Sequence, residues 1–414
     1  MKRIMLITPM LHQGGFERIC VMTARLLSKK YDVVIAVFSM EDVAFDISGL
    51  KVIDLNIATK PGKLSKIINV LKRSMALTRL QKKLGTDISY SFGMTANIAN
   101  ALTWGAKKKL TACHSFEEIK SSFYMKLISR HSDKVLCCSK KMADLVESRY
   151  HFANVQALWN PCDIDGARKQ SRETEGEDLS FFEGADKVLV SMGREDDVKG
   201  FWHLIKAFKR VNEQEKNTRL AIVGDGGFEE YKELVRKLGI EDRVCFTGLK
   251  RNPFPYLKAS DLYLLTSLSE GLPNALVEAL SLSLPIVSVN CLSGPAEILH
   301  ENWKYAEQKT EIFKADYGVL APVLGSEKNL EVEYEAADKT AREGMQVSAS
   351  DVEDGMKGCC VKLEPSQEAL AEAILLMLRD EELYKNYQNK AAKRAEDFSA
   401  ENHIRELILC MEAL

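Results

Sequence analysis

Short apolar runs alternate with amphipathic segments along all 414 residues of the chain. In the first half, the apolar runs predict strands at residues 3–8, 33–38, 88–92, 109–113, 134–138 and 155–159. The segments between them mostly show the 3.6-residue period of helices. In the second half the pattern restarts, with strands expected at residues 187–192, 220–223, 262–265 and 285–290. Strands that are apolar throughout are buried on both faces, so each half predicts an α/β fold with a parallel, doubly wound sheet.

The length of the chain favours two domains, because a single ordinary core stops growing beyond about 250–300 residues. The predicted N-terminal domain spans residues 1–167 and the second domain spans residues 168–398, with a terminal helix at 399–414. Residues 324–357 are acidic, poor in apolar side chains and punctuated by Gly, which predicts a surface insertion in the second domain. A content of 46% hydrophobic and 28% charged residues is typical of a soluble globular enzyme.

Charge is distributed unevenly, although the net charge of the chain is only −2. Residues 1–165 hold 25 Lys and Arg against 14 Asp and Glu, a net charge of +11. The remaining residues hold 32 basic and 45 acidic side chains, a net charge of −13. This asymmetry predicts that the first half meets a negatively charged partner.

The cysteines and the apolar runs indicate the compartment. Ten cysteines are scattered without a Cys-x-x-Cys pair, which favours a reducing compartment and argues against a disulfide framework or a zinc site. The start of the chain is interrupted by Pro9 and lacks a small-residue cleavage site, so a strand is expected there rather than a signal peptide. Residues 88–106 are uncharged but rich in Ser, Thr, Asn and Gly, which argues against a membrane span. A cytoplasmic protein is therefore expected.

Residues 64–84 predict a basic amphipathic helix. Apolar side chains recur at helical spacing at Leu64, Ile67, Ile68, Leu71 and Met75. The charge comes from Lys63, Lys66, Lys72, Arg73, Arg79, Lys82 and Lys83. Two interpretations stay open. In the commoner case the stripe packs on the sheet and the lysines are solvated; in the other, the helix lies on an anionic membrane surface.

Distinctive polar residues follow the expected strand at 262–265. Glu270 and Gly271 are expected to form a tight loop, and Pro273 to open a helix whose second turn carries Glu278. Loop amides and a helix N-terminus favour a negatively charged ligand, because unpaired N–H groups and the helix dipole act together. A carboxylate is electrostatically awkward at the rim of a phosphate site, so Glu270 is expected to face a sugar.

Other loops carry candidate chemistry as well. Arg194 and Lys199 lie in the loop GREDDVKG after the first strand of the second half, and their charges suit a diphosphate. Gly14 and Gly15 follow the first strand of the chain, which fits either a tight turn or the phosphate-facing corner of a nucleotide-binding unit. His114 directly follows a strand at its carboxyl end, where parallel sheets place ligands, although a lone histidine is more often structural.

Three of these motifs together resemble one enzyme family. Glu270 and Glu278, with seven residues between them, resemble the E-x7-E motif of retaining GT-B glycosyltransferases of the family 4 type. The loop GREDDVKG resembles the family's G-R-x(4)-K-G, and Asn160-Pro161-Cys162-Asp163 resembles its N-P-x-D. The resemblance implies two Rossmann-like domains facing across a cleft, with the donor mostly in the C-terminal half and the acceptor mostly in the N-terminal half. It also implies that the terminal helix crosses back to the first domain.

The resemblance assigns expected roles to individual residues. Glu270 contacts the donor sugar and forms the expected catalytic pair with His114, while Glu278 binds the ribose hydroxyls. The expected donor-binding residues are Gly14, Gly15, Arg194, Lys199, Gly248, Leu249, Leu272, Pro273, Asn274, Ala275 and Glu278. Pro273 stands where many relatives carry Gly, which puts contacts to the sugar hydroxyls in doubt. No metal and no other cofactor are expected, because Arg194, Lys199 and the helix N-terminus can bear the charge of the leaving group.

The expected reaction moves a sugar, with retention, from a nucleotide diphosphate donor to an acceptor, and UDP is the preferred nucleotide. The basic first domain fits a glycan or polyprenyl-diphosphate-linked glycan acceptor at the inner face of the cell membrane, as in surface polysaccharide or glycoconjugate assembly. No nucleic-acid partner is expected. The alternatives are a nucleotide-sugar epimerase of the same fold, which needs no acceptor, and a non-catalytic nucleotide-binding subunit.

Overall fold

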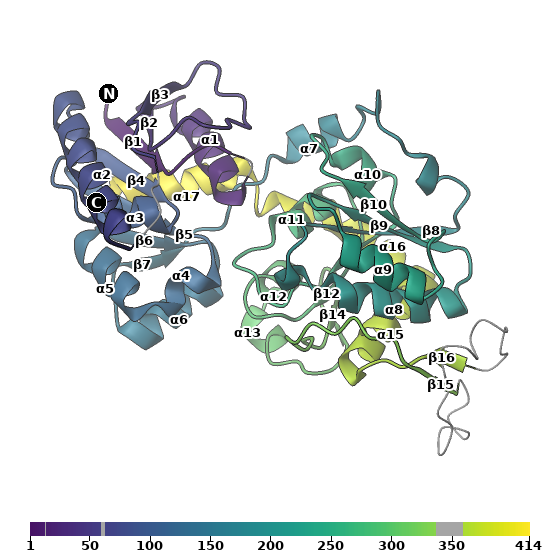
Figure 1. Ribbon diagram of the computed structural model, residues 1–414. Helices are drawn as coiled ribbons and strands as arrows, with labels where there is room; N and C mark the ends of the chain where they lie inside the picture. The colour runs from purple at the N-terminus through teal and green to yellow at the C-terminus, as the bar shows by residue number, and fades with distance from the viewer. Residues whose placement is uncertain (13, 59–62, 337–358) are drawn as a thin grey trace. The chain divides into compact units, whose positions relative to one another are not determined.

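The chain folds into two compact units. The computed structural model describes residues 1–12, 14–58, 63–336 and 359–414 (Figure 1). Unit 1 comprises Met1–Cys162 together with Phe398–Leu414, and unit 2 comprises Asp163–Asp397. Each unit is built on a seven-stranded, largely parallel sheet. The predicted fold class of two doubly wound, Rossmann-like domains is therefore confirmed.

The sheet of unit 1 is parallel throughout, in the order β3-β2-β1-β4-β5-β6-β7. Its strands are β1 (Arg3–Thr8), β2 (Asp32–Val37), β3 (Lys51–Asp54), β4 (Ile88–Phe92), β5 (Lys108–Cys113), β6 (Lys134–Cys137) and β7 (Val155–Ala157). The edge strand β3 was not predicted, because its sequence KVID is short and charged at both ends.

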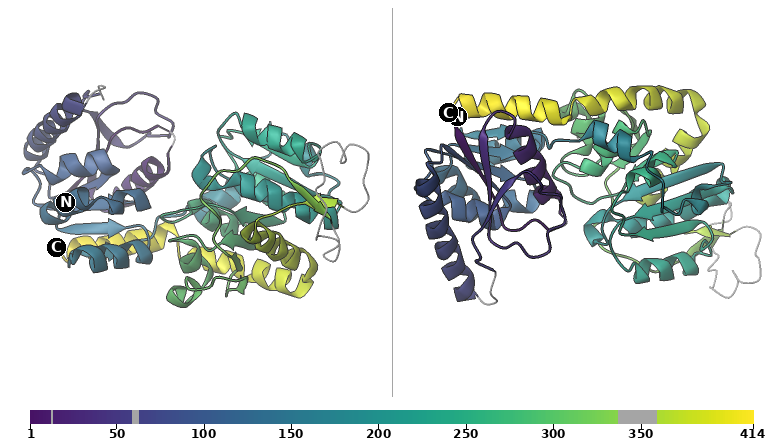
Figure 2. Two further views of the ribbon diagram at one scale, coloured as in Figure 1. Left: turned by 60° about the horizontal axis from the view of Figure 1, so that its bottom comes forward. Right: turned by 90° about the horizontal axis from the view of Figure 1, so that it is seen from above.

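Helices cover both faces of this sheet (Figure 2). They are α1 (Gly15–Leu27), α2 (Lys63–Leu84), α3 (Met94–Ala101), α4 (Phe116–Lys120), α5 (Ser122–His131), α6 (Lys140–Tyr150) and α17 (Ala400–Glu412). The residues of β1 alternate between two cores. Ile4 and Leu6 belong to the core with α1 and α17, and Met5 and Ile7 to the core with α2 and α3. Burial on both faces is the reason that the strand is apolar at each position from Ile4 to Ile7.

The sheet of unit 2 repeats the same order, β10-β9-β8-β11-β12-β14-β13, and only the edge strand β13 is antiparallel. Its strands are β8 (Lys187–Met192), β9 (Thr218–Val223), β10 (Val244–Gly248), β11 (Leu262–Leu265), β12 (Ile286–Val289), β13 (Phe313–Lys314) and β14 (Val319–Ala321). A separate antiparallel pair joins β15 (Tyr334–Ala336) to β16 (Cys359–Val361). The predicted insertion at 324–357 includes β15, and its residues 337–357 lie outside the described part of the chain.

Unit 2 also carries helices on both faces of its sheet. They are α7 (Ile164–Gln170), α8 (Phe201–Gln214), α9 (Glu229–Lys237), α10 (Phe254–Lys258), α11 (Asn274–Ser281), α12 (Pro295–Leu299), α13 (Trp303–Ala306), α15 (Pro365–Arg379) and α16 (Glu381–Glu396), with 3-10 turns at Ser180–Phe182 and Asp197–Lys199. The predicted boundary between residues 167 and 168 falls inside α7, which packs against α10 and α11.

The strand order reverses between β1 and β4 in unit 1 and between β8 and β11 in unit 2. Open α/β sheets bind ligands at such switch points, beyond the carboxyl ends of the strands, because the connecting loops diverge to opposite faces there. The switch point of unit 2 brings together the loop after β8, with Arg194 and Lys199, and the loop after β11, with Glu270. Two motifs that lie about 70 residues apart in the sequence are therefore neighbours for a reason of topology.

The apolar stripe of helix α2 does not pack on the sheet at four of its five positions. Ile67, Ile68, Leu71 and Met75 are exposed, so the interpretation in which the stripe packs there is wrong for these four residues. The side chain of Leu64 lies outside the described part of the structure. The uncharged stretch 88–106 holds β4 and α3, as its polar residues predicted. Within the described residues, every helix is too short or too polar to span a bilayer.

Candidate active site

The candidate site lies at the carboxyl edge of the sheet in unit 2, where four loops meet. The loop after β8 begins with Gly193, and its Arg194 is 75% exposed. The guanidinium of Arg194 donates to Oδ2 of Asp196 over 2.9 Å from Nη2 and 3.2 Å from Nε. Oδ1 of Asp196 accepts the Val198 N–H at 3.1 Å and so caps the following 3-10 turn. Asp196 therefore holds the exposed guanidinium against the loop that carries it.

Lys199 and Glu270 form an ion pair that the sequence motifs did not predict. The Nζ atom of Lys199 lies 2.7 Å from Oε1 of Glu270, and the side chains are 25% and 13% exposed, respectively. The pair joins Lys199, the residue predicted to bind the diphosphate, to Glu270, the residue predicted to face the sugar. A carboxylate at the rim of a cationic site is thereby stabilised by a partner from the neighbouring loop.

Backbone contacts at the switch point fix this pair. Gly200 adopts φ +62°, and a Cβ atom there would lie 2.4 Å from the carbonyl oxygen of Thr266. Thr266 Oγ1 donates to the carbonyl of Lys199 at 3.0 Å, and the Leu268 N–H donates to the carbonyl of Val198 at 2.7 Å. The close approach that only glycine permits thus sets the separation of the two loops.

Helix α11 begins directly beyond Glu270. Its first residue is Asn274 and Pro273 is the N-cap, so the expectation that Pro273 opens the helix is wrong by one position. With ψ +94°, Pro273 has not yet entered the helical conformation. Asn274 and Ala275 begin α11 at this loop, where the positive end of the helix dipole favours negative charge. Leu272 is buried beneath it.

Glu278 lies in the second turn of α11, as predicted, and is buried. Tyr263 on β11 is also buried, and its hydroxyl finds no hydrogen-bond partner among the described residues. Burial, followed by the negative charges of Glu270 and Glu278, raises the pKa of Tyr263. Burial and Glu270 likewise raise the pKa of Cys291, just beyond β12, while Lys199 opposes this rise. The two glutamates of the E-x7-E motif therefore act on the same end of β11.

The loop after β12 closes the site from the other side. Ser293 and Gly294 both have positive φ, at +69° and +96°. The Ser293 hydroxyl donates to the carbonyl of Gly271 at 2.7 Å. A Cβ atom at Gly294 would lie 2.4 Å from Cδ of Pro273. This loop is packed against the Glu270–Pro273 segment and limits its movement.

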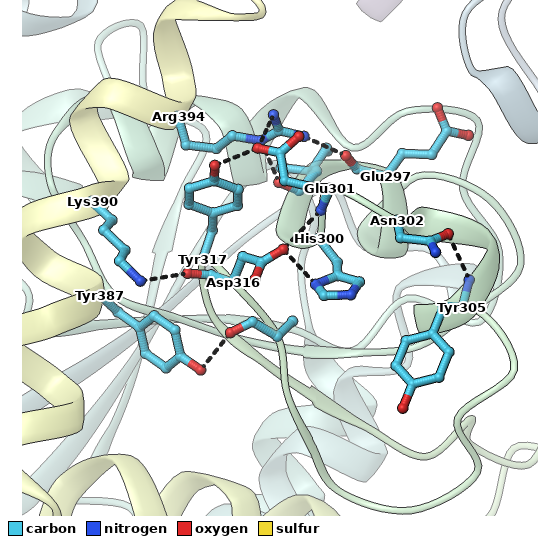
Figure 3. Close-up of polar contacts among 12 residues, drawn as sticks. Glu297, His300, Glu301, Asn302, Tyr305, Asp316, Tyr317, Tyr387, Lys390 and Arg394 are labelled. Atoms are coloured by element: carbon cyan, nitrogen blue, oxygen red, sulfur yellow. Dashed lines mark hydrogen bonds and ion pairs between the residues drawn. The ribbon is translucent and has the colours of Figure 1, made fainter.

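A polar network anchors the helix that follows this loop (Figure 3). Arg394 of α16 is buried and donates to the carbonyls of Ile298 at 2.8 Å and Glu297 at 2.7 Å, near the end of α12. Oδ2 of Asp316 accepts the Glu301 N–H at 2.9 Å and lies 2.6 Å from Nδ1 of His300. Arg394, which lies 96 residues beyond Ile298 in the sequence, thus fixes the far end of α12 and, through it, the loop at the site.

The remaining predicted residues of unit 2 lie on the loops after β9 and β10. Gly224 approaches the Gly193 carbonyl so closely that a Cβ atom would lie 1.8 Å from its oxygen, so this glycine serves loop packing. Gly248 ends β10 with φ +70°, and Leu249 beside it is exposed. That Gly248 and Leu249 bind the donor stays a prediction.

The predicted residues of unit 1 lie at the carboxyl edge of its own sheet. Gly14 is extended, and a Cβ atom there would lie 2.2 Å from Oε2 of Glu17. Glu17 is buried in the first turn of α1, and its burial raises its pKa. A carboxylate of the chain itself therefore occupies the helix end that attracts anions. Sequence reasoning missed Glu17, although an acidic residue in the first turn after a Gly pair is a usable signal.

His114 follows β5 and is held in a fixed orientation. Its Nδ1 lies 3.1 Å from Oδ1 of Asn160, and its ring stacks on Phe92 with centroids 5.8 Å apart. Burial lowers the pKa of His114 to about 4, against the opposing effect of Asn160, so the imidazole is neutral at physiological pH. Among the described residues its buried Nε2 has no hydrogen-bond partner. The position of His114 and its neutral state therefore suit a role as an uncharged hydrogen-bonding group.

Two further motifs have structural explanations. Ser139 caps α6, because its hydroxyl accepts the Met142 N–H at 3.2 Å. Asp163 of the Asp-x-Asp sequence caps α7 through the Gly166 N–H at 2.9 Å, and Asp165 is fully exposed. Within the described residues, no cluster of three His, Cys, Asp or Glu side chains has the arrangement of a metal site.

The fold and these loops define a glycosyltransferase of the GT-B class. The family model described as glycosyl transferases group 1 matches residues 174–310, which span the loops after β8, β9, β11 and β12. An uncharacterized glycosyltransferase of Methanocaldococcus jannaschii is 30% identical over 309 residues, covering 72% of this chain and 69% of the relative. The chain belongs to the group 1 glycosyl transferases.

Longer but more distant similarities extend over the whole chain. A Campylobacter jejuni protein is 23% identical over 407 residues, covering 94% of this chain and 93% of the relative. Its name is N-acetylgalactosamine-N,N'-diacetylbacillosaminyl-diphospho-undecaprenol 4-alpha-N-acetylgalactosaminyltransferase. The crystal structure of Anabaena HepE in complex with UDP-glucose covers all of both chains with a TM-score of 0.69 at 17% identity. The structure of WaaG, a glycosyltransferase involved in lipopolysaccharide biosynthesis, covers 97% of this chain and 98% of that one, with a TM-score of 0.63 at 16% identity.

Proposed function

We propose that this glycosyltransferase is a retaining enzyme of the family 4 type. In this proposal it moves a hexose-type sugar from a UDP-sugar to a glycan or polyprenyl-diphosphate-linked glycan at the inner face of the cell membrane. The observation that carries the proposal is the Lys199–Glu270 ion pair at the switch point, beside Arg194 and the first amides of α11. A diphosphate needs fixed positive charge, and a sugar needs hydrogen-bond acceptors. This edge of the sheet offers both.

The chemistry follows from these charges. Transfer breaks the bond between the anomeric carbon and the diphosphate oxygen and forms a bond to the acceptor oxygen, whose proton passes to the departing diphosphate. Negative charge grows on the departing diphosphate, and Arg194, Lys199 and the α11 amides stabilise it without a metal. Loss of one such donor costs roughly 3 kcal/mol of transition-state stabilisation. Glu270 contacts the donor sugar without acting as a nucleophile, Glu278 binds ribose, and neutral His114 hydrogen-bonds the transferred sugar.

Two relatives support the choice of substrates. The HepE structure was solved with UDP-glucose, which supports a uridine nucleotide. The name of the Campylobacter protein includes a diphospho-undecaprenol, which supports a lipid-linked acceptor. The HepE structure covers all of this chain, and the match to the Campylobacter protein covers 94% of it.

The first test is thermal unfolding with UDP, GDP, ADP and a panel of UDP-sugars. A ligand at 100 times its dissociation constant adds about 2.7 kcal/mol to the free energy of unfolding of the domain that binds it. UDP is expected to raise the melting temperature, and Arg194→Ala to abolish the rise. Arg236→Ala on α9 is the matched control, because Arg236 is also exposed but lies on a helix away from the carboxyl-edge loops. Failure of every nucleotide to stabilise the protein would contradict the proposed nucleotide site.

A second measurement distinguishes transfer from epimerisation. With the nucleotide-sugar identified by stabilisation, NMR of the product reports both the need for an acceptor and the anomeric configuration. We expect turnover only with an acceptor, retention of configuration, and at least a 100-fold loss of kcat in Glu270→Gln. Turnover of the donor to an epimer without an acceptor would identify an epimerase, and an inverted product would overturn the retaining assignment.

A further inference from the structure

Helix α2 presents an apolar stripe to solvent. Ile67, Ile68, Leu71 and Met75 are between 42% and 61% exposed. Positions spaced by one, four and eight residues lie along one side of a helix, so the four side chains form a continuous stripe. Figures 1 and 2 show α2 on the outside of unit 1. Single exposed apolar residues are common, but a contiguous exposed stripe marks a binding surface.

The opposite side of α2 is buried and carries polar side chains beside the core residue Leu77, which fixes the stripe outward. Arg73 is 4% exposed, donates to the Ile57 carbonyl at 2.8 Å from Nη2 and 3.1 Å from Nε, and stacks on Phe38. Asn69 is also buried and donates to the Ala58 carbonyl at 3.4 Å. Rotation of the helix to bury the stripe would break these hydrogen bonds. Around Asn69 and Arg73 the helix therefore packs by polar side chains and leaves its apolar ones exposed, whereas Leu77 further along joins the core.

This orientation leaves buried polar atoms unsatisfied. The hydroxyls of Ser74 and Thr78 and the amide of Gln81 are buried without a hydrogen-bond partner among the described residues. When the protein is free in water, the burial of these unpaired polar groups and the exposure of the apolar stripe both raise the free energy of the folded state. A surface that takes up the stripe offsets this cost and gives the orientation a function.

The charge around the stripe identifies the surface. Residues 63–84 include seven Lys and Arg and no Asp or Glu. Lys72, Arg79, Lys82 and Lys83 are exposed, and within the described chain none of them forms an ion pair with a carboxylate. Unpaired basic side chains beside an exposed apolar stripe complement anionic lipid headgroups above acyl chains.

An exposed tryptophan extends the same face. Trp104 is 63% exposed, and Nζ of Lys82 lies 5.9 Å from its ring centroid. The next residue, Gly105, packs so tightly on α2 that a Cβ atom would lie 2.6 Å from both the Thr78 carbonyl oxygen and Cβ of Gln81. The loop is thus attached to the C-terminal half of the helix. Tryptophan is enriched where proteins meet the interface between headgroups and acyl chains.

We propose that the outer face of α2, together with Trp104, docks unit 1 on an anionic lipid bilayer. Ile67, Ile68, Leu71 and Met75 enter the interface, and the exposed basic side chains contact the headgroups. A second copy of this chain is a poorer occupant, because two acid-free basic helices repel each other. A nucleic acid would bind the charges but leave the stripe in water. The proposal extends the proposed function by naming the surface that brings the enzyme to a lipid-linked acceptor, and it stands on observations separate from the transfer site.

The test is co-sedimentation of the full chain, without nucleotide, on vesicles of phosphatidylcholine alone or mixed with phosphatidylglycerol. We expect binding to the anionic vesicles that weakens at high salt, and little binding to the neutral ones. The variant Ile68→Ser/Leu71→Ser and the variant Lys72→Gln/Arg79→Gln are each expected to lower vesicle affinity at least ten-fold. The control Val323→Ser/Leu409→Ser removes two exposed apolar residues elsewhere and is expected to bind like the wild type. Circular dichroism melting establishes that each variant is folded.

Several outcomes would overturn the proposal. Unchanged vesicle binding in the Ile68→Ser/Leu71→Ser variant would do so. So would a wild-type dimer that this variant converts to monomer, or tighter binding to DNA or RNA than to anionic vesicles. Because vesicle binding is read without turnover, a protein that binds vesicles but transfers no sugar would contradict only the proposed function. Activity on a short-chain soluble acceptor with no vesicle binding would contradict only the docking surface.

Discussion

The neighbourhood of His114 shows how burial sets protonation in this protein. Glu118 lies in the first turn of α4, and its Oε2 accepts the N–H groups of His114 at 2.7 Å and Ser115 at 3.1 Å. Burial nevertheless raises the pKa of Glu118 to about 7, while these N–H groups oppose the rise. The same burial lowers the pKa of His114. Burial therefore pushes both groups toward the neutral form.

The shift at Glu118 predicts a pH dependence of stability. The pKa of its carboxyl is about 7 when folded and 4.5 ordinarily, so between these values the folded state keeps a proton that the unfolded chain releases. A rise in pH from 4.5 to 7 therefore lowers the free energy of unfolding, by roughly 3 kcal/mol in total. Glu118→Gln removes this loss, so the variant is expected to gain stability relative to the wild type across that window.

Urea denaturation at a series of pH values measures this difference. The opposing titration of His114 is common to both proteins and cancels when their free energies of unfolding are subtracted. Glu117→Gln is the control, because Glu117 is its exposed neighbour, and its curve is expected to run parallel to that of the wild type. If the free energy of unfolding of Glu118→Gln also ran parallel to that of the wild type across this pH range, the raised pKa of Glu118 would be contradicted.

At the scale of whole elements, the loops of unit 2 are held in place by close backbone approaches. Gly294 has φ +96°, and a Cβ atom there would lie 2.4 Å from Cδ of Pro273, so the loop after β12 packs closely on the Glu270–Pro273 segment at this position. Gly294→Ala is expected to lower the free energy of unfolding by about 1–3 kcal/mol. The shift of that segment is also expected to reduce sugar transfer.

Gly227→Ala is the matched control for this glycine. Gly227 lies on the loop after β9, has no positive φ, and has no atom closer than 3.8 Å to a Cβ position. Its substitution is expected to be neutral or to stabilise the fold by less than about 1 kcal/mol, because alanine restricts the unfolded chain. Thermal unfolding and a transfer assay on both variants test the prediction. Equal effects of the two substitutions would show that close packing at Gly294 is unimportant.

Sequence reasoning succeeded where a signal is local. Strand, loop and helix follow one another within a dozen residues at Arg194–Lys199 and at Glu270–Glu278, so periodicity and turn residues predict the elements that carry the site. The Lys199–Glu270 pair could not be predicted, because its partners are 71 positions apart and meet only through the strand order. The orientation of α2 could not be predicted either, since its pattern fits burial of either side and tertiary hydrogen bonds decide the outcome.

At the scale of the whole molecule, the end of the chain completes the core at its beginning. Leu407, Cys410 and Met411 of α17 belong to the same buried core as β1 and α1. The connection is fixed before α17 begins. The rings of Trp159 and Phe398 lie 4.6 Å apart, and Cys162 pairs with Ser399 in a β-bridge. Unit 1 therefore depends on residues that are synthesised only after the whole of unit 2.

This dependence predicts where a substitution in α17 acts. Leu407→Ala removes a fully buried side chain, and deletions of this kind cost about 2–5 kcal/mol, because the surrounding core collapses only partly. Hydrogen exchange measured by mass spectrometry is expected to accelerate in β1, β2 and α1, nearly 400 residues away in sequence, and to stay unchanged in β8 and β9. Leu409→Ala on the same helix removes a side chain that is 55% exposed and is expected to leave every segment protected. Equal loss of protection in β8 and β9 after Leu407→Ala would mean that the two units unfold together, and the cost of the cavity would then be shared by the whole chain.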